Sequence, residues 1–265
     1  MRAAGGFALA ALLLAGAAPE PAADLYILAG QSNMSGRSTL DELTRAERAT
    51  DPAITLYGND GRWRLAAEPL DTADGQVDEV SADRQAAVGP GMFFARAMRA
   101  HRRAALGLLP CAKGGVTISR WQPSDGRDTL YGSCLARVAE AQRPVAGILW
   151  YQGESDAERP GEQADQWPRR FRELVIRWRA DLGRSDMPVV FVQLSDRPKH
   201  NRDRFPSWER VQQLQAGFSM PCVAVVKAAG LAKEPDELHL ATAGQRELGK
   251  RMAAAMLRLQ KKGCR

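Results

Sequence analysis

The sequence predicts an α/β fold, a three-layer α/β/α sandwich in which helices cover both faces of a parallel sheet. Three observations support this fold class. Apolar, strand-like runs alternate along the chain with amphipathic, helix-like stretches. The strand-like runs are continuously apolar, as is typical of strands buried on both faces. The chain has 265 residues, of which 45% are hydrophobic and 26% charged, so it can bury a sizeable core.

Six apolar runs are predicted as strands. Parallel strands need crossover connections, which are almost always right-handed, and the intervening helix-like stretches can supply them. The predicted strands are residues 25–29, 54–57, 105–110, 146–151, 188–194 and 222–227.

Five stretches are predicted as helices, and two of them have signals at their start. A Gly-Pro-Gly sequence at 89–91 interrupts the chain before one helix. Thr242 is predicted to cap the last helix, whose apolar residues recur at helical spacing. The predicted helices are residues 92–102, 130–141, 164–181, 208–217 and 242–259.

Two segments lack a regular pattern. Residues 58–88 are polar and rich in Asp, Gly and Ala, and residues 198–206 are very polar. A loop as long as the first is unusual in a compact domain and is often functional. We find no internal repeat or low-complexity linker, so residues 24–265 are predicted to form a single domain.

Residues 1–23 are predicted to be a secretory signal peptide. Arg2 gives a positive start, an apolar stretch follows over 7–18, and small residues precede the expected cleavage site. The alternative is an uncleaved N-terminal anchor, but the apolar stretch is shorter than the roughly 20 residues that span a bilayer. We therefore expect an exported protein, periplasmic or secreted, whose mature chain is not inserted in a membrane.

The four cysteines fit an oxidising compartment. They allow three pairings, and the sequence alone does not choose among them. We favour Cys111–Cys134 together with Cys222–Cys264. None lies in a Cys-x-x-Cys pair, which argues against a zinc or redox site.

The chain carries a formal net charge of +6. Its basic residues are mostly scattered arginines, and no run combines them with exposed aromatics in the manner of a nucleic-acid-binding surface. We therefore expect no nucleic-acid partner. The oligomeric state is not readable from the sequence.

Four segments that follow predicted strands carry unusual polar residues. In a parallel sheet these segments meet at one edge, where α/β proteins place their sites. Gln31, Ser32 and Asn33 follow the first strand, and two glycines follow a later one. The segments are 30–33, 113–115, 152–156 and 236–239.

Ser32 is the candidate nucleophile, although a serine before a helix is also a common N-cap. A serine needs a base to take its proton. Of three histidines, His101 lies among arginines on a helix and His200 lies in a polar loop. His239 remains, with Asp236 three residues before it to accept the hydrogen bond from its Nδ1–H. We therefore predict a triad of Ser32, His239 and Asp236.

Backbone N–H groups at Gly114 or Gly115 are candidates for an oxyanion hole, because glycine lets the backbone approach a ligand. The Gln152 amide could complete it. Glu154 and Asp156 are expected to orient their loop or contact substrate. As an alternative, this carboxylate pair suggests a glycosidase, but that interpretation leaves Ser32 and His239 without a role.

The motifs resemble a known family. Gly30-Gln-Ser-Asn-Met34, Pro110-Cys-Ala-Lys-Gly-Gly115, Trp150-Tyr-Gln-Gly-Glu-Ser-Asp156 and Asp236-Glu-Leu-His239 look like the SGNH (GDSL-like) hydrolases. The likeness is to the sialate O-acetylesterase-like branch, with carbohydrate esterase family 6 and plant probable carbohydrate esterases. It extends from Asp24 to about residue 257, with the four motifs in order.

The resemblance implies a flavodoxin-like α/β/α sandwich and hydrolysis of acetyl esters on carbohydrates, without a metal or organic cofactor. It implies Ser32 as nucleophile, His239 as base and Asp236 as its orienting acid. The oxyanion hole would use the Ser32 N–H, a glycine N–H and Gln152. The usual Gly-x-Asn-Asp block of the superfamily reads Gln-Gly-Glu-Ser-Asp here, so the donor that replaces the Asn stays open.

The sequence leaves the acetylated substrate open among xylan, sialic acid and other glycans. Gln31, Asn33 and Trp121 are further candidates for substrate contact or loop support. Trp121 follows the glycine loop, and its ring either stacks on a sugar or belongs to the core. A carbohydrate-binding protein on an inactive esterase scaffold is the other alternative.

Overall fold

The computed structural model describes residues 23–200 and 202–263. Its seven-stranded sheet has the order β3-β2-β4-β1-β5-β6-β7. All neighbouring strands are parallel except β2 and β3, which pair antiparallel at one edge. The strands are β1 (Asp24–Gly30), β2 (Ile54–Tyr57), β3 (Trp63–Leu65), β4 (Leu106–Pro110), β5 (Val145–Tyr151), β6 (Val189–Gln193) and β7 (Val223–Lys227).

The strand order explains where a site forms. Without the β2–β3 edge, the order β4-β1-β5-β6-β7 corresponds to the flavodoxin-like order 2-1-3-4-5. Its topological switch point lies between β1 and β5, since the chain leaves β1 toward β4 on one side and continues to β5 on the other. Ligands bind at such points, outside the carboxyl ends of the strands. The α/β/α fold class predicted from the sequence is therefore confirmed.

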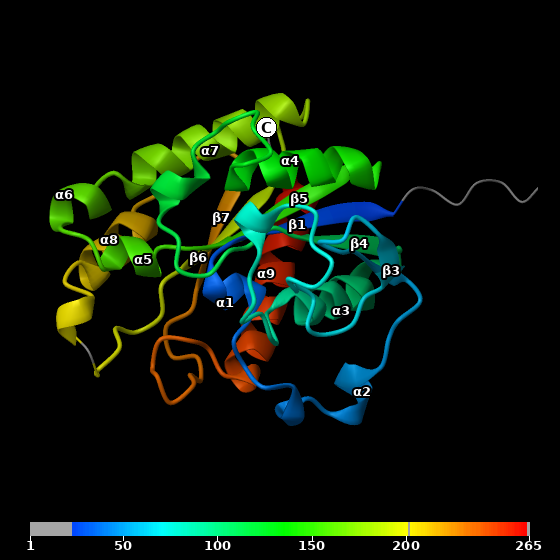
Figure 1. Ribbon diagram of the computed structural model, residues 1–265, viewed down its shortest axis with the longest axis horizontal. Coiled ribbons are helices and arrows are strands. Elements are labelled where there is room, and N and C mark those ends of the chain that lie inside the picture. The colour runs from blue at the N-terminus through cyan, green and yellow to red at the C-terminus, as the bar shows by residue number, and fades with distance from the viewer. Residues whose placement is uncertain (1–22, 201, 264–265) are drawn as a thin grey trace, which may run out of the picture.

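Helices cover both faces of the sheet, with α4 and α7 on one side and α3 and α9 on the other (Figure 1). Short helices lie near the carboxyl ends of the strands, among them α1 after β1 and α5 after β5. The α-helices are α1 (Ser32–Ser35), α2 (Arg45–Arg48), α3 (Gly91–Arg102), α4 (Leu130–Ala141), α5 (Glu154–Ala157), α6 (Gly161–Ala164), α7 (Trp167–Asp181), α8 (Trp208–Ala216) and α9 (Thr242–Lys262).

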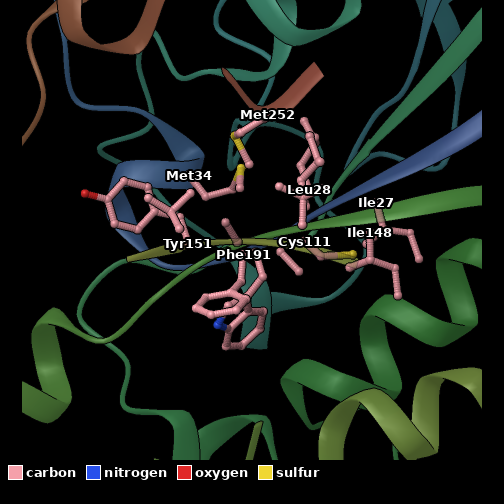
Figure 2. Packing of buried hydrophobic residues seen from close by; sticks show 14 of the residues in the cluster. Ile27, Leu28, Met34, Cys111, Ile148, Tyr151, Phe191 and Met252 are labelled. Atoms are coloured by element: carbon pink, nitrogen blue, oxygen red, sulfur yellow. The ribbon is translucent and has the colours of Figure 1, made fainter. Parts of the chain in front are cut away.

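The core extends across both faces of the sheet. Every residue of β5 is buried, and its alternate side chains reach opposite layers. Trp150 contacts Trp178 of α7, whereas a side chain at Gly147 would meet Met256 of α9. Figure 2 shows part of this cluster, with residues from β1, β5 and β6 beside Met34 of α1.

The long segment predicted as an irregular loop, 58–88, contains β3. This strand escaped prediction because it has three residues, two of them exposed, and so shows no apolar run. The predicted helix 164–181 is divided into α6 and α7, with Pro168 in the first turn of α7. Thr242 is not the N-cap of α9, which is Ala241, and its hydroxyl donates to the Thr39 carbonyl instead.

The disulfide Cys111–Cys134 is confirmed. Cys264, the expected partner of Cys222, lies outside the described residues, as do residues 1–22 of the predicted signal peptide. Across 23–200 and 202–263, no helix is both long and apolar enough to cross a membrane.

Candidate active site

The turn from β1 into α1 places Ser32 at the carboxyl end of the central strand. Gly30 ends β1 with a φ of 129°, and a Cβ there would lie 2.1 Å from the Tyr151 carbonyl oxygen of β5. Only glycine fits this close approach. Ser32 is the first residue of α1 and is almost fully buried. The turn that carries Ser32 thus lies between β1 and β5, at the switch point of the sheet.

The three residues of the predicted triad are brought together in the structure. The His239 Nε2 lies 3.0 Å from the Ser32 Oγ, and its Nδ1 lies 2.5 Å from an Asp236 oxygen. The other Asp236 oxygen accepts the backbone N–H groups of Leu238 and His239, each at 2.9 Å. The chain of hydrogen bonds is the one by which a serine hydroxyl loses its proton to an imidazole oriented by a carboxylate.

Asp236 is held in its ionised form. Partial burial alone would raise the pKa of this carboxyl, but the hydrogen bonds from the backbone and ring of His239 outweigh it and lower the pKa below its usual value. An ionised Asp236 accepts the Nδ1–H bond, which leaves Nε2 free to accept the serine proton.

Asn33 connects the serine turn to the histidine loop. Its side-chain oxygen accepts the Leu240 N–H at 2.9 Å, and its Nδ2 donates to the Leu238 carbonyl at 3.2 Å. The same Nδ2 donates to Glu154 at 2.7 Å. Asn33 is completely buried and does not line the pocket, and its hydrogen bonds connect three segments around the site.

A pocket of about 680 Å³ lies over the triad. It opens at the carboxyl ends of the strands, and its walls come from segments far apart in the sequence. Most of its lining side chains are polar or charged, which suits a ligand rich in hydroxyl groups. The lining residues are Gln31, Ser32, Arg37, Glu79, Ala82, Asp83, Arg84, Gln85, Lys113, Gly114, Gly115, Glu154, Ser155, Glu158, His200, Arg204, Phe205, Asp236, Leu238 and His239.

The two glycines of the predicted oxyanion hole differ in the structure. The Gly114 N–H donates to an Asp83 carboxylate oxygen at 2.9 Å and is therefore occupied. In the described part of the chain, no protein acceptor takes the N–H of Gly115 or of Ser32. Both of these residues line the pocket. The geometry therefore favours Ser32 and Gly115 over Gly114 as donors to an oxyanion.

Gln152 is not placed in the oxyanion hole. Its side chain is fully buried and does not line the pocket. Its Nε2 donates to the Val116 carbonyl at 3.1 Å and also to Asp156, while its Oε1 accepts the Trp167 indole N–H at 3.0 Å. The predicted role as an oxyanion donor is therefore not available to this amide, because its hydrogen bonds hold the strand end to the core.

Gln31 lines the pocket beside the first of the two carboxylates after β5, Glu154. The Gln31 Oε1 lies 3.3 Å from the Ser155 N–H and thereby joins the two sides of the switch point. Burial raises the pKa of Glu154 to about 7 and that of Asp156 to about 6. Glu154 borders the triad pocket, whereas Asp156 borders a neighbouring one. The pair does not flank a single cavity, as a glycosidase would need.

Trp121 lies in the core. It is fully buried, and its ring packs edge-on against Trp150 and Trp178. The possibility that it stacks on a sugar is therefore wrong for this conformation, and the core alternative is the one observed.

Several pocket residues were missed by the sequence analysis. Arg37 and Asp83 form a nearly buried ion pair, and Arg204, Phe205 and His200 also line the pocket. All of them come from segments without periodicity. Apart from Arg37, which follows the nucleophile turn and gave no signal, their only signal was membership in the long polar segments 58–88 and 198–206.

The described residues contain no group of three or more His, Cys, Asp or Glu side chains arranged to hold a metal ion. The groups at the pocket that can take part in acyl transfer include the Ser32 hydroxyl, the His239 imidazole and the backbone N–H of Gly115.

Comparison with known proteins places this site in context. A family model described as "carbohydrate esterase, sialic acid-specific acetylesterase" matches residues 22–258. A probable carbohydrate esterase of Arabidopsis thaliana is 31% identical over an alignment of 256 positions, which covers 90% of this chain and 92% of the relative. The crystal structure of that plant protein superposes with a TM-score of 0.76, covering 90% of this chain and 99% of the other.

Two more distant structures share the fold. A carbohydrate acetylesterase from Xanthomonas citri has a TM-score of 0.67 at 21% identity, covering 90% of this chain and 57% of that one. The protein NanS has a TM-score of 0.68 at 17% identity, covering 92% of this chain and 99% of that one.

Proposed function

Since the chain belongs to the carbohydrate esterase, sialic acid-specific acetylesterase family and is a carboxylic-ester hydrolase, we propose that it removes O-acetyl groups from carbohydrates by a serine mechanism. The observation that carries the proposal is the hydrogen-bonded series Ser32–His239–Asp236 at the base of a polar pocket. A glycosidase would not need this series.

In the first half-reaction, the Ser32 Oγ attacks the acetyl carbonyl carbon while the His239 Nε2 takes the hydroxyl proton. The carbonyl oxygen becomes an oxyanion. When the tetrahedral intermediate collapses, the bond to the sugar oxygen breaks, and His239 returns the proton to that oxygen. The products are the free sugar hydroxyl and an acetyl ester on Ser32.

In the second half-reaction, water attacks the acetyl-enzyme while His239 takes one of its protons. The ester bond to Ser32 then breaks, the serine oxygen regains a proton from His239, and acetate leaves. Asp236 stays ionised throughout and orients the imidazole. The N–H groups of Ser32 and Gly115 are the proposed donors to the oxyanion in both steps. Each donor of this kind is worth about 3 kcal/mol of transition-state stabilisation.

The pocket supports a carbohydrate as the group that carries the acetyl. Its walls present charged and amide side chains that suit sugar hydroxyls, and the named relatives are carbohydrate esterases. We also propose that the protein is exported, on the basis of its predicted signal peptide and the Cys111–Cys134 disulfide.

The test compares the mature protein with Ser32→Ala on p-nitrophenyl acetate and acetylated xylan. We expect acetate release by the native enzyme and a loss of several orders of magnitude in the variant, because the oxyanion donors alone give only residual catalysis. Mass spectrometry after rapid quenching should detect an acetyl adduct on native Ser32. Full activity in Ser32→Ala would reject the serine mechanism, whatever the substrate.

A further inference from the structure

Residues 82–88, the end of the long loop between β3 and α3, lie between the nucleophile turn and the glycine loop. On one side, the Ala87 N–H donates to the Gly36 carbonyl at 3.1 Å, and Ser38 and Val88 form an isolated antiparallel bridge. On the other side, the Lys113 Nζ donates to the Ala82 carbonyl. We call residues 82–88 the strap.

Asp83 is the strap residue that contacts both neighbours. One of its oxygens accepts the Gly114 N–H at 2.9 Å and the Ser35 hydroxyl at 2.8 Å. Arg37 donates to both oxygens, at 2.8 and 3.0 Å. The Asp83 side chain is only 5% exposed. Such a buried carboxylate with several donors fixes the groups around it, because charge-assisted hydrogen bonds are short and directional.

Asp83 remains ionised in this environment. Burial alone would raise the pKa of the carboxyl, but the hydrogen bonds and positive charge of Arg37, with those of Ser35 and Gly114, outweigh burial and lower it. The glycine loop packs tightly against this ion pair, because a Cβ on Gly114 would lie 2.2 Å from Arg37 and 3.0 Å from Asp83.

We propose that Asp83 is a positioning residue for catalysis, which aims the Gly115 N–H at the oxyanion by holding the preceding amide. The Gly114 N–H is directed away from substrate toward the strap, so the next peptide N–H remains for the pocket. Ser35, on the same helix as Ser32, bonds the same Asp83 oxygen. One carboxylate therefore sets the nucleophile and the oxyanion donor relative to each other.

This inference rests on the proposed serine mechanism and adds to it a residue outside the triad. A purely structural Asp83 would change stability but not the rate per folded molecule. If Asp83 positions the donor, its substitution should lower kcat, because a misplaced N–H no longer bonds the oxyanion in the transition state. KM should change little.

The first experiment measures kcat and KM on p-nitrophenyl acetate for Asp83→Ala. We expect kcat to fall about 10- to 100-fold, which is no more than the fall caused by removing an oxyanion donor altogether. KM should stay within about threefold of the native value. Asp83→Asn retains one carbonyl oxygen, so it should recover part of the lost rate. A folded Asp83→Ala variant with kcat within about threefold of native would overturn the inference.

Asp78→Ala is the matched control. Asp78 lies in the same loop, is also 5% exposed and also pairs with an arginine, Arg127 at 2.6 Å, but it does not line the pocket. We expect this variant to lose stability and keep its kcat. If Asp78→Ala and Asp83→Ala lose kcat equally, the loss comes from general loosening of the loop, which would contradict the positioning role.

A second measurement uses the native protein, so it does not depend on any variant folding. Ser32 is labelled with a p-nitrophenyl alkylphosphonate, which loses p-nitrophenolate and leaves a phosphonyl oxygen where the oxyanion would lie. Amide NMR should show a large shift and slower exchange for Gly115, whereas Gly114, already bonded to Asp83, should change little. A response at Gly114 instead of Gly115 would overturn the inference.

The outcomes separate this inference from the proposed function. If the native enzyme releases no acetate, or Ser32→Ala remains active, the serine mechanism fails and the inference falls with it. If native activity depends on Ser32 while Asp83→Ala is folded and fully active, the mechanism stands and only the positioning role is rejected.

Discussion

Asp236 and Asp83 both border the pocket, but they are held in different ways. The Asp236 side chain is 49% exposed and bonds residues two and three positions further along the chain. The Asp83 side chain is 5% exposed; it accepts one local bond, from the Gln85 N–H, but its other partners, Ser35, Arg37 and Gly114, lie 31 to 48 positions away. The first aspartate is thus organised by a local turn, and the second by the packing of three segments.

This difference shows how the two halves of the proposed mechanism are built. Proton transfer depends on a short turn at 236–239, whose geometry is largely set by neighbouring residues. Stabilisation of the oxyanion depends on tertiary structure, because the donor's position is fixed by a carboxylate from another loop. We therefore expect substitutions in the turn at 236–239 to affect proton transfer, and substitutions at Asp83 to affect stabilisation of the oxyanion.

The largest expected effect is that of Asp236→Asn. An amide in place of the carboxylate no longer fixes the tautomer of His239 or stabilises its charged form, so kcat should fall by about 10⁴-fold. Steady-state kinetics on p-nitrophenyl acetate measure this. Asp165→Asn, which alters an aspartate of similar exposure in a surface pair with Arg210, should leave kcat unchanged. Retention of a tenth of native kcat by Asp236→Asn would contradict the triad and favour a site in which another acid orients the histidine.

Glu154→Gln tests another carboxylate that borders the pocket, and here we expect an effect on stability. Burial raises the pKa of Glu154 from 4.5 to about 7. Between these values the folded state keeps a proton that the unfolded state has lost, so native stability falls as pH rises through this window and remains low above it. Glutamine removes this dependence. The free energy of unfolding of the variant, taken relative to that of the native protein, should therefore be about 1–3 kcal/mol higher at pH 8 than at pH 5.

Urea unfolding of both proteins at pH 5 and pH 8 measures this difference. The comparison with native protein at each pH cancels the contributions of other buried acids. An identical stability difference at the two pH values would show that Glu154 is ionised throughout, and its hydrogen bond from Asn33 would then be a charged one.

The smallest effect on activity is expected for the double variant Cys111→Ser/Cys134→Ser. Removing this cross-link, which joins residues 23 positions apart, should lower stability by about 3 kcal/mol through the entropy of the unfolded chain. The loop at 113–115 would still be held by Asp83, so kcat below the melting transition should stay within about twofold. A tenfold loss of kcat in the folded variant would assign the placement of that loop to the disulfide.

Much of the fold could be predicted because its strands are continuously apolar. The predicted strands agree with β1, β2 and β4 to β7 to within one residue at most ends, and α4 agrees throughout. The short elements α1, α2 and α5 were missed, since four residues carry no periodicity. β3 was missed for the same reason, and its place at the edge is set by pairing with β2.

The site was predictable where its geometry is local. The Asp-x-x-His spacing and a serine after a buried strand were enough to predict Ser32, Asp236 and His239 as the triad. Arg37 and Asp83 gave no such signal, because 46 residues separate them and neither lies in a pattern. Gln152 and Trp121 show the converse problem. The sequence placed them near the site, but only packing determines whether a side chain at a strand end faces the pocket or the core.

The strap has a consequence for altering this enzyme. Arg84 and Gln85, which border the pocket, directly follow Asp83, which holds the glycine loop. Two residues that line the pocket and the proposed positioning residue are thus carried by one continuous piece of chain. Exchanging the whole loop for that of a relative would change preference and turnover together, so a graft meant to alter only the choice of glycan should replace the neighbours of Asp83 and keep the aspartate itself.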